Sequence, residues 1–122
     1  FDDGAALMAF RMRDRSGTQH WASATYRTAD GVRRSFPADA VRWEVVRRWQ
    51  SPRTGADYPV AVRVHVGDAR YDVEPMFDDQ ESDSRVTTGA VYWEGAVVTK
   101  RDGRRVGLGY LELTGYASKL QL

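Results

Sequence analysis

Apolar and polar residues alternate at period two along most of this chain, and this is the feature that most restricts its fold. Gly, Pro and Asp interrupt the alternation about every 8 to 12 residues, a spacing typical of all-β domains. The pattern predicts strands at residues 6–13, 20–27, 32–36, 41–49, 60–66, 71–77, 91–101 and 106–116. Helical periodicity is absent, and we expect at most a turn over residues 117–122. The pattern indicates a barrel or sandwich of about eight antiparallel strands, mostly in up-and-down order.

Composition limits what the chain can do. A length of 122 residues suits one domain with one core. The net charge of +1 creates no strong attraction to nucleic acid or an anionic membrane, and no apolar run approaches the roughly 20 residues of a membrane span. Cysteine is absent, and His20 and His65 lack zinc-site spacing, so we expect neither a metal nor a cofactor. The first residue is not methionine, so we expect the chain to be part of a larger protein.

Two polar connections lie between the predicted strands. SPRTGADYP, residues 51–59, is a loop by its Pro, Gly and Asp content, and its Arg53 and Tyr58 either brace the loop or gate a ligand. DDQESDSRVTTG, residues 78–89, is rich in carboxylates but lacks the glycine and the distal glutamate of an EF-hand calcium loop. We therefore expect a solvated loop with one carboxylate turned inward toward an arginine.

The final hairpin, residues 91–116, carries Glu94 and Glu112 within otherwise apolar or aromatic strands. Asp102-Gly103 is a strong signal for a two-residue turn and fixes the predicted register. In that register the two carboxylates lie on opposite faces, and both faces are largely apolar. A bulge that slips the register by one residue would instead set Glu94 directly opposite Glu112. The predicted pairs are Arg101–Arg104, Gly95–Tyr110, Glu94–Leu111 and Trp93–Glu112.

Three interpretations of the two glutamates are open from the sequence. Either residue could form a surface pair with an arginine such as Arg101, which contributes under about 1 kcal/mol. Either could be buried and held by Arg47, which interrupts the apolar face of residues 41–49. Either could act as an acid in an apolar cavity, where burial would raise its pKa enough for it to donate a proton at neutral pH.

Four motifs occur in an order that resembles a known family: WQSPRTGADYP, PMFDDQE, VYWEGAV and GYLELTGY. They resemble the C-terminal half of the bacterial AttH-like proteins, which are related to carotenoid 1,2-hydratase (hydroxyneurosporene synthase). The opening FDDGAALMAFRMRDRSG is similar to the first strand and turn of the same half. The resemblance implies one antiparallel lipocalin-like barrel over residues 1–122, with an N-terminal lipocalin-like domain as its neighbour in the whole protein.

The resemblance also implies an activity and a location. Carotenoid hydratases add water across an isoprenoid double bond that an acid protonates, without metal or organic cofactor, and other members are predicted secreted hydrolases. The family aspartate best suited to donate that proton lies upstream of Phe1. Glu94 and Glu81 match family motif positions and are, with Glu112, the catalytic candidates of this chain. We expect a bacterial periplasmic or secreted protein, with the cytoplasm and the membrane surface as alternatives.

Two functional hypotheses follow. In the first, the barrel encloses an apolar cavity for an isoprenoid or lipid-like ligand, with contacts from Phe10, Trp49, Arg53, Tyr58, Tyr92, Trp93 and Tyr110. In the second, the domain has no pocket, and its aromatic faces pack against the N-terminal domain or another partner, or the isolated domain forms a homodimer. The first hypothesis predicts a hollow interior that shelters acids, and the second predicts exposed apolar surface.

Overall fold

The structure, a computed structural model, describes residues 1–117. Within them lie nine strands, all paired antiparallel, and one short 3-10 helix. The strands are β1 (Ala6–Arg13), β2 (Gln19–Arg27), β3 (Arg33–Phe36), β4 (Val41–Gln50), β5 (Asp57–Val66), β6 (Ala69–Pro75), β7 (Glu81–Ser84), β8 (Ala90–Arg101) and β9 (Arg104–Leu113), with η1 (Ala38–Ala40) before β4. The predicted all-β antiparallel fold is confirmed. The turn expected over residues 117–122 lies, apart from Ala117, outside the described residues.

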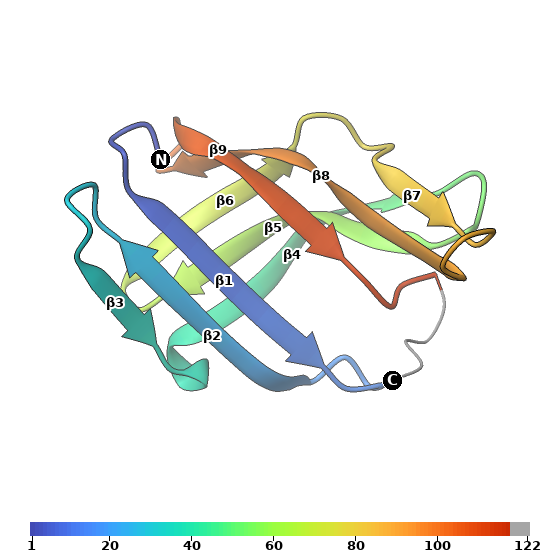
Figure 1. The fold of residues 1–122 in the computed structure, drawn as a ribbon, viewed down its shortest axis with the longest axis horizontal. Helices are drawn as coiled ribbons and strands as arrows, with labels where there is room; N and C mark the ends of the chain where they lie inside the picture. The colour runs from blue at the N-terminus through green and yellow to red at the C-terminus, as the bar shows by residue number, and fades with distance from the viewer. Residues whose placement is uncertain (118–122) are drawn as a thin grey trace.

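The strands form two separately hydrogen-bonded sheets within residues 1–117. One sheet has the order β1-β2-β3, and the other has the order β4-β5-β6-β8-β7, with β9 also paired to β8. In Figure 1, β1, β2 and β9 cross the front of the molecule, while β4, β5 and β6 lie behind them. The domain is therefore a flattened, two-layered, barrel-like fold that hydrogen bonds do not close within residues 1–117. No β-ladder joins β3 to β4, and none joins β1 to β9, which run side by side in Figure 1 and form the edge that we call the seam.

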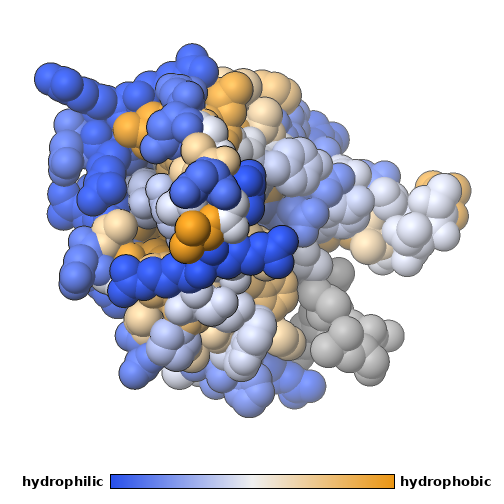
Figure 2. Space-filling model, turned by 60° about the vertical axis from the view of Figure 1, so that its left-hand side comes forward, coloured by the Kyte–Doolittle hydropathy of each residue, from blue (hydrophilic) through white to orange (hydrophobic). Residues whose placement is uncertain are grey.

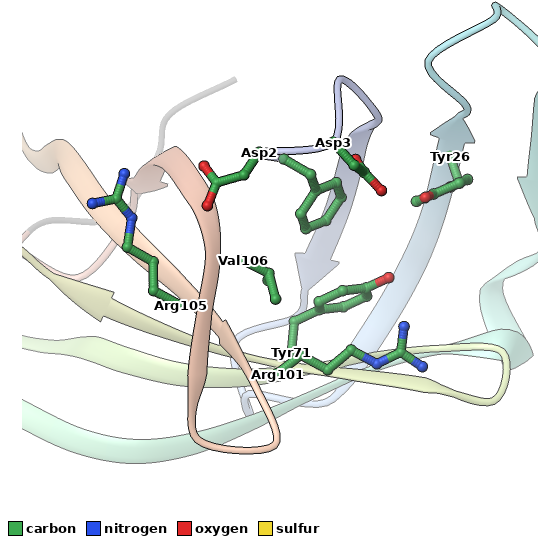
Figure 3. A pocket seen from close by; sticks show the side chains of 8 residues that line it. Asp2, Asp3, Tyr26, Tyr71, Arg101, Arg105 and Val106 are labelled. Carbon is green, nitrogen blue, oxygen red and sulfur yellow. The ribbon is translucent and has the colours of Figure 1, made fainter.

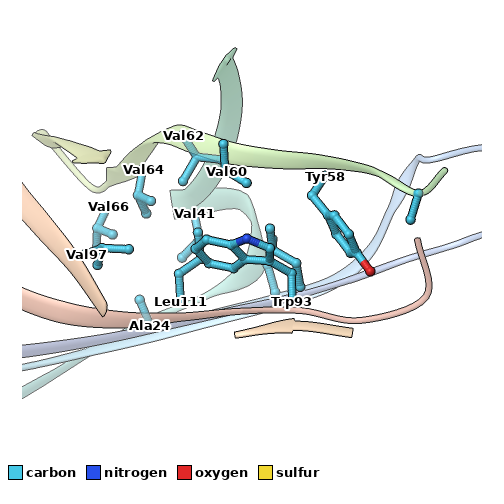
Figure 4. Packing of buried hydrophobic residues seen from close by; sticks show 13 residues of the cluster. Ala24, Val41, Tyr58, Val60, Val62, Val64, Val66, Trp93, Val97 and Leu111 are labelled. Carbon is cyan, nitrogen blue, oxygen red and sulfur yellow. The ribbon is translucent and has the colours of Figure 1, made fainter. Parts of the chain in front are cut away.

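The core lies between the two layers, because the inward positions of both are apolar. Trp93, Tyr58 and Val60 have no exposed surface, and Trp93 is the largest buried side chain. Figure 4 shows Trp93 among the valines of β5 on one side and Leu111 of β9 on the other. Its indole N–H donates to the carbonyl of Asp78 at 2.6 Å, so its polar atom is satisfied. This part of the interior is filled with side chains.

The β8–β9 hairpin adopts the slipped register. The turn pairs as predicted, but a bulge between Thr99 and Lys100 shifts the remaining pairs by one residue, so that Glu94 lies opposite Glu112. The prediction that the two carboxylates lie on opposite faces is therefore wrong. Both belong to the outer face of the hairpin.

Packing explains the bulge. In the observed register Trp93 pairs with Leu113, and both are buried, as is Leu111 two residues earlier. Without the bulge Glu112 would oppose Trp93 on the inward face, and its charge would lose its hydration. Burial of three apolar side chains therefore outweighs the small local cost of one unpaired bulge residue.

The observed strands differ from the predicted ones in smaller ways too. β5 begins at Asp57, three residues before the predicted start, and β6 and β9 end at Pro75 and Leu113, before their predicted ends. The polar connection over residues 78–89 contains the short strand β7. β4 has two bulges, between Val45 and Arg47 and between Arg47 and Trp49, so Arg47 leaves the apolar face. Its guanidinium binds Asp78 with contacts of 3.0 and 2.7 Å, so the interpretation that Arg47 holds a hairpin glutamate is wrong.

Candidate functional site

Two adjoining cavities lie toward one end of the barrel, and we name them by their depth. The outer cavity has a volume of about 280 Å³. The inner cavity has a volume of about 210 Å³ and lies at the seam between β1 and β9. Phe1 and Tyr71 line both cavities. The outer cavity is shown in Figure 3 and is lined by Phe1, Asp2, Asp3, Tyr26, Tyr71, Arg101, Arg105 and Val106.

The inner cavity is apolar along most of its wall. Ala9 and Leu111 line it from the seam strands, and Val64, Val73 and Val97 line it from the opposite layer. The space exists because β1 and β9 meet without a ladder and because a small residue, Ala9, stands where a larger one would fill the gap. The wall therefore suits an apolar molecule better than water.

Trp43 adds one polar group to the inner cavity wall. Its indole N–H is buried and has no hydrogen-bond partner among the described residues. The guanidinium of Arg11 lies over the same ring, 5.8 Å from its centroid, which stabilises the ring position by a cation–π contact. A buried donor without an acceptor costs about 1–3 kcal/mol.

The outer cavity combines aromatic rings with balanced charge. Arg101 lies over the ring of Tyr71 at 5.7 Å, and burial raises the pKa of the Tyr71 phenol. Asp3 accepts a hydrogen bond from the amide of Ala5 at 2.9 Å, which fixes that carboxylate at the cavity rim. The lining holds two carboxylates and two guanidinium groups. A uniformly charged ligand would therefore meet attraction and repulsion together.

A different cluster closes the opposite end of the barrel, around Glu81. The Glu81 side chain is fully buried. The Ser51 hydroxyl donates to Oε1 at 2.7 Å, while the hydroxyls of Thr54 and Tyr58 donate to Oε2 at 2.7 and 2.8 Å. Arg53 approaches Oε1 at 3.4 Å and also binds the exposed Asp79 at 2.6 Å. These contacts pin the loop over residues 51–56 to strand β7.

The environment of Glu81 keeps it ionised. Burial acts to raise the pKa of its carboxyl, but the hydrogen bonds from Thr54, Ser51 and Tyr58 and the charge of Arg53 outweigh burial, so the pKa lies below its ordinary value. The same burial and the contact with Glu81 raise the pKa of the Tyr58 phenol. Glu81 is the inward carboxylate that the sequence predicted for residues 78–89, and Arg53 is its arginine.

The three catalytic candidates do not line either cavity. Glu81 lies in the pinned cluster, and Glu94 and Glu112 face each other on the outside of the hairpin. Neither of the latter two makes an ion pair within residues 1–117. Partial desolvation and the carboxylate of Glu94 raise the pKa of Tyr110. A catalytic role for the three glutamates stays a prediction.

The predicted ligand contacts are dispersed over the domain. Tyr110 lines the inner cavity, although 63% of its surface is exposed. Trp93 and Tyr58 are core residues, and Trp49 stacks on Tyr58 with ring centroids 6.3 Å apart. Phe10 is half exposed on the outer face of β1. The remaining two, Tyr92 on the outer face of β8 and Arg53 in the pinned cluster, line neither cavity.

Apart from Tyr110, sequence reasoning missed the residues that line the cavities. Trp43, Tyr26, Tyr71 and Arg101 belong to none of the motifs that suggested a ligand site. Their common signal is contact between strands far apart in the sequence, which a local pattern does not contain. Residues 1–117 hold no group of three or more His, Asp or Glu side chains placed to bind a metal ion, and none of their helices has the length and apolarity to span a bilayer.

Comparison with known proteins identifies relatives of the whole chain. The sequence model of the AttH-like family matches residues 1–116. A protein from Nitrosomonas europaea, assigned as AttH, has a crystal structure that superimposes with a TM-score of 0.90 at 52% identity. The match covers 94% of this chain and 36% of that chain. No curated protein matches the sequence significantly.

A second solved structure shares the fold at much lower identity. Kievitone hydratase from Nectria haematococca superimposes with a TM-score of 0.68 at 17% identity, over 95% of this chain and 36% of that chain. At this identity the likeness shows the fold alone. The two structures together support the lipocalin-like fold predicted from the sequence. The present chain spans little more than a third of either protein.

Proposed function

The chain belongs to the AttH-like family, and from this premise we propose that its lipocalin-like domain binds an apolar, lipid-like or isoprenoid ligand for a longer protein. The inner cavity carries this proposal. Its wall is formed largely by aliphatic side chains such as Leu111, Val64 and Val97, and Thr99 and Tyr110 add residues that carry a hydroxyl group. A ligand with an apolar body and a polar end matches this lining.

The size of the inner cavity sets the length of ligand that it accepts. Its volume of about 210 Å³ is below the roughly 300–1,000 Å³ of drug-sized pockets. It therefore holds a short chain or one segment of a longer isoprenoid. Each Å² of apolar ligand surface removed from water contributes about 25 cal/mol, so a short chain binds with modest affinity.

We assign binding, rather than proton transfer, to this domain. Hydration of a double bond needs an acid next to the alkene. The carboxylates of Glu81, Glu94 and Glu112 lie away from the inner cavity, and Glu81 is already held ionised by its donors. The proton donor of a hydratase built on this domain is therefore proposed to come from the remaining part of the longer protein.

The test uses two enlargements of matched size on neighbouring strands of the intact protein. Ala9→Phe adds a ring inside the inner cavity, whereas Ser23→Phe adds a ring next to Phe10, whose side chain is exposed outside the barrel. Titration with 1-decanol by calorimetry should give one site in the wild type. Ala9→Phe should weaken binding at least about tenfold, and Ser23→Phe should leave it unchanged. Equal affinity of Ala9→Phe and the wild type would show that the inner cavity is not the binding site.

A second candidate function, docking, is favoured by an exposed apolar face. This outer apolar face consists of Met8, Phe10, Met12, Trp21, Leu108 and Tyr110, each between 43% and 67% exposed. Phe10 and Trp21 make an edge-to-face contact at 5.4 Å, so the rings are ordered without a covering partner. We propose that another domain of the same polypeptide covers this face, because the chain spans 36% of the length of its N. europaea relative.

The three methionines of the chain provide an internal test of docking. Met8 and Met12 belong to the outer apolar face, and Met76, 50% exposed, lies outside it. In the intact protein, a covering domain should slow peroxide oxidation of Met8 and Met12 but not of Met76. Similar oxidation rates at all three would contradict docking. Protection that increases with protein concentration would identify a second copy as the occupant and would contradict a covering domain.

A further inference from the structure

The ring of Phe1 stands between the two cavities. Phe1 lines both of them, and its ring lies 5.3 Å from the ring of Tyr71 and 6.1 Å from that of Tyr26. The contacts join a residue before β1 to side chains on β6 and β2. The Phe1 side chain therefore belongs to the wall that the two cavities share.

The seat of Phe1 is shaped by a glycine of β9. A Cβ atom at Gly107 would lie 2.9 Å from the Phe1 Cα, closer than real Cβ contacts, and 3.3 Å from the Phe1 ring. The next residue, Asp2, donates its amide to the carbonyl of Val106 at 2.8 Å, which fixes the backbone beside the seat. Phe1 itself is only partly buried. The Phe1 ring therefore contacts the rings of Tyr71 and Tyr26 and the backbone at Gly107. Moving the ring would break no hydrogen bond, because a phenylalanine side chain makes none.

The outer cavity adds a preference for the outer end of the ligand. Asp2 and Asp3 contribute two negative charges, and Arg101 and Arg105 contribute two positive charges. A hydroxyl group both donates to a carboxylate and accepts from a guanidinium, so it suits this mixed lining. A carboxylate would meet repulsion from the two aspartates and attraction from the two arginines, and it would also lose hydration, so it gains less than a hydroxyl group. Figure 2 shows that this end of the molecule, where the chain begins in Figure 1, is mostly hydrophilic with small hydrophobic patches between.

We propose that Phe1 is a displaceable plug, and that the ligand is an elongated, uncharged amphiphile that spans both cavities when the plug moves aside. Its apolar chain lies in the inner cavity, and its hydroxyl end lies among Asp2, Asp3, Arg101 and Arg105. The proposal rests on the proposed binding function and specifies its ligand class. Neither cavity alone reaches about 300 Å³, and the joined space falls within the range of ordinary ligand sites.

The first experiment measures how affinity depends on chain length. Straight-chain alcohols from 1-octanol to 1-dodecanol are titrated into the intact protein and into the Phe1→Ala variant. Each methylene that enters apolar surroundings should strengthen binding about fourfold. In the wild type this gain should stop once the inner cavity is full and the plug resists, and in Phe1→Ala it should continue to longer alcohols. Identical profiles in both proteins would overturn the plug.

A second variant displaces Phe1 by changing the residue beneath it. It keeps the proposal testable if Phe1→Ala does not fold. Gly107→Ala keeps the Phe1 ring but displaces the Phe1 backbone, whose Cα is the atom nearest to the added methyl group, and the ring moves with it. It should therefore extend the chain-length profile as Phe1→Ala does, with an unchanged far-ultraviolet circular dichroism spectrum. A folded Gly107→Ala protein with the wild-type profile would count against the plug even where Phe1→Ala fails to fold.

The third experiment tests the uncharged end and separates this inference from the proposed function. 1-Decanol should bind at least about tenfold more tightly than decanoate at neutral pH, and exchange of Asp2 and Asp3 for asparagine should reduce that preference. Decanoate binding as well as decanol would overturn the ligand class. The proposed function fails when Ala9→Phe leaves alcohol binding intact. The inference alone fails when Ala9→Phe abolishes binding while Phe1→Ala and the asparagine variants change nothing.

Discussion

The two ends of the domain are built from the same alternating strands but differ in how their interiors are filled. At the pinned end, the buried Glu81 receives three hydroxyl hydrogen bonds and the charge of Arg53. At the open end, the Trp43 indole has no partner within the described residues, and two cavities remain. Polar contacts hold the side chains of the pinned end in place, whereas side chains do not fill the interior of the open end.

The difference shows which end of the fold is held by polar contacts and which end is left for the proposed binding function. A buried carboxylate is tolerated only when its donors are held in place, so the pinned end fixes the loop over residues 51–56 to β7. An unsatisfied donor beside an apolar void costs free energy in the empty domain. Under the proposed function, a ligand that fills the inner cavity would stabilise this end of the domain, because it binds the folded state and not the unfolded chain.

The largest expected effect comes from breaking the pinned end. Glu81→Ala should lower the free energy of unfolding by at least about 3 kcal/mol, because it leaves the hydroxyls of Ser51, Thr54 and Tyr58 without their acceptor, whereas Arg53 keeps Asp79. Urea denaturation of the intact protein measures this change. Asp79→Asn is the matched control on the exposed side of Arg53, and it should cost under about 1 kcal/mol. Equal costs for the two variants would show that Glu81 does not organise this end.

A matched pair of tryptophans, one at each end of the domain, should give an effect on stability of intermediate size. The Trp93 N–H donates to Asp78, whereas the Trp43 N–H has no partner among the described residues. Trp93→Phe should therefore cost about 3 kcal/mol through lost volume and an orphaned carbonyl. Trp43→Phe should cost at least about 1 kcal/mol less, because it also removes an unsatisfied donor. Thermal and urea unfolding of both variants provide the measurement, and a larger cost for Trp43→Phe would mean that its N–H is in fact satisfied.

Much of the fold could be predicted because alternation is a local property. The valines from Val60 to Val66 are buried as the period of two requires, and Asp102-Gly103 makes the predicted turn. The register beyond the turn could not be predicted in the same way. Choosing between the straight and the bulged hairpin requires knowing that Trp93 faces the core, which is a tertiary fact.

The candidate site was less predictable than the fold. Aromatic residues were reasonable ligand contacts by type, yet Phe10 faces outward and Trp93 fills the core. The cavities arise where β1 and β9, from opposite ends of the chain, meet without a ladder. No stretch of sequence encodes that gap. The inward carboxylate of residues 78–89 was predictable, because a buried charge requires an arginine or several donors nearby.

The smallest expected effect is the pH dependence that separates the two ends. The pKa of Glu81 is lower in the folded protein than its ordinary value, so its contribution to stability is fully present above about pH 5. That contribution is lost as the pH falls through the pKa that Glu81 has in the folded protein, because Glu81 is then protonated in the folded state as it already is in the unfolded state. Urea unfolding at a series of pH values from neutral to acidic should therefore show the stability difference between wild type and Glu81→Gln narrowing in acid. Ala9→Phe at the open end should keep the wild-type slope, since it changes no titrating group. A constant stability difference between wild type and Glu81→Gln across the series would mean that the pKa of Glu81 is the same in the folded and unfolded states. The two ends of the domain would then not differ in the pH dependence of their stability.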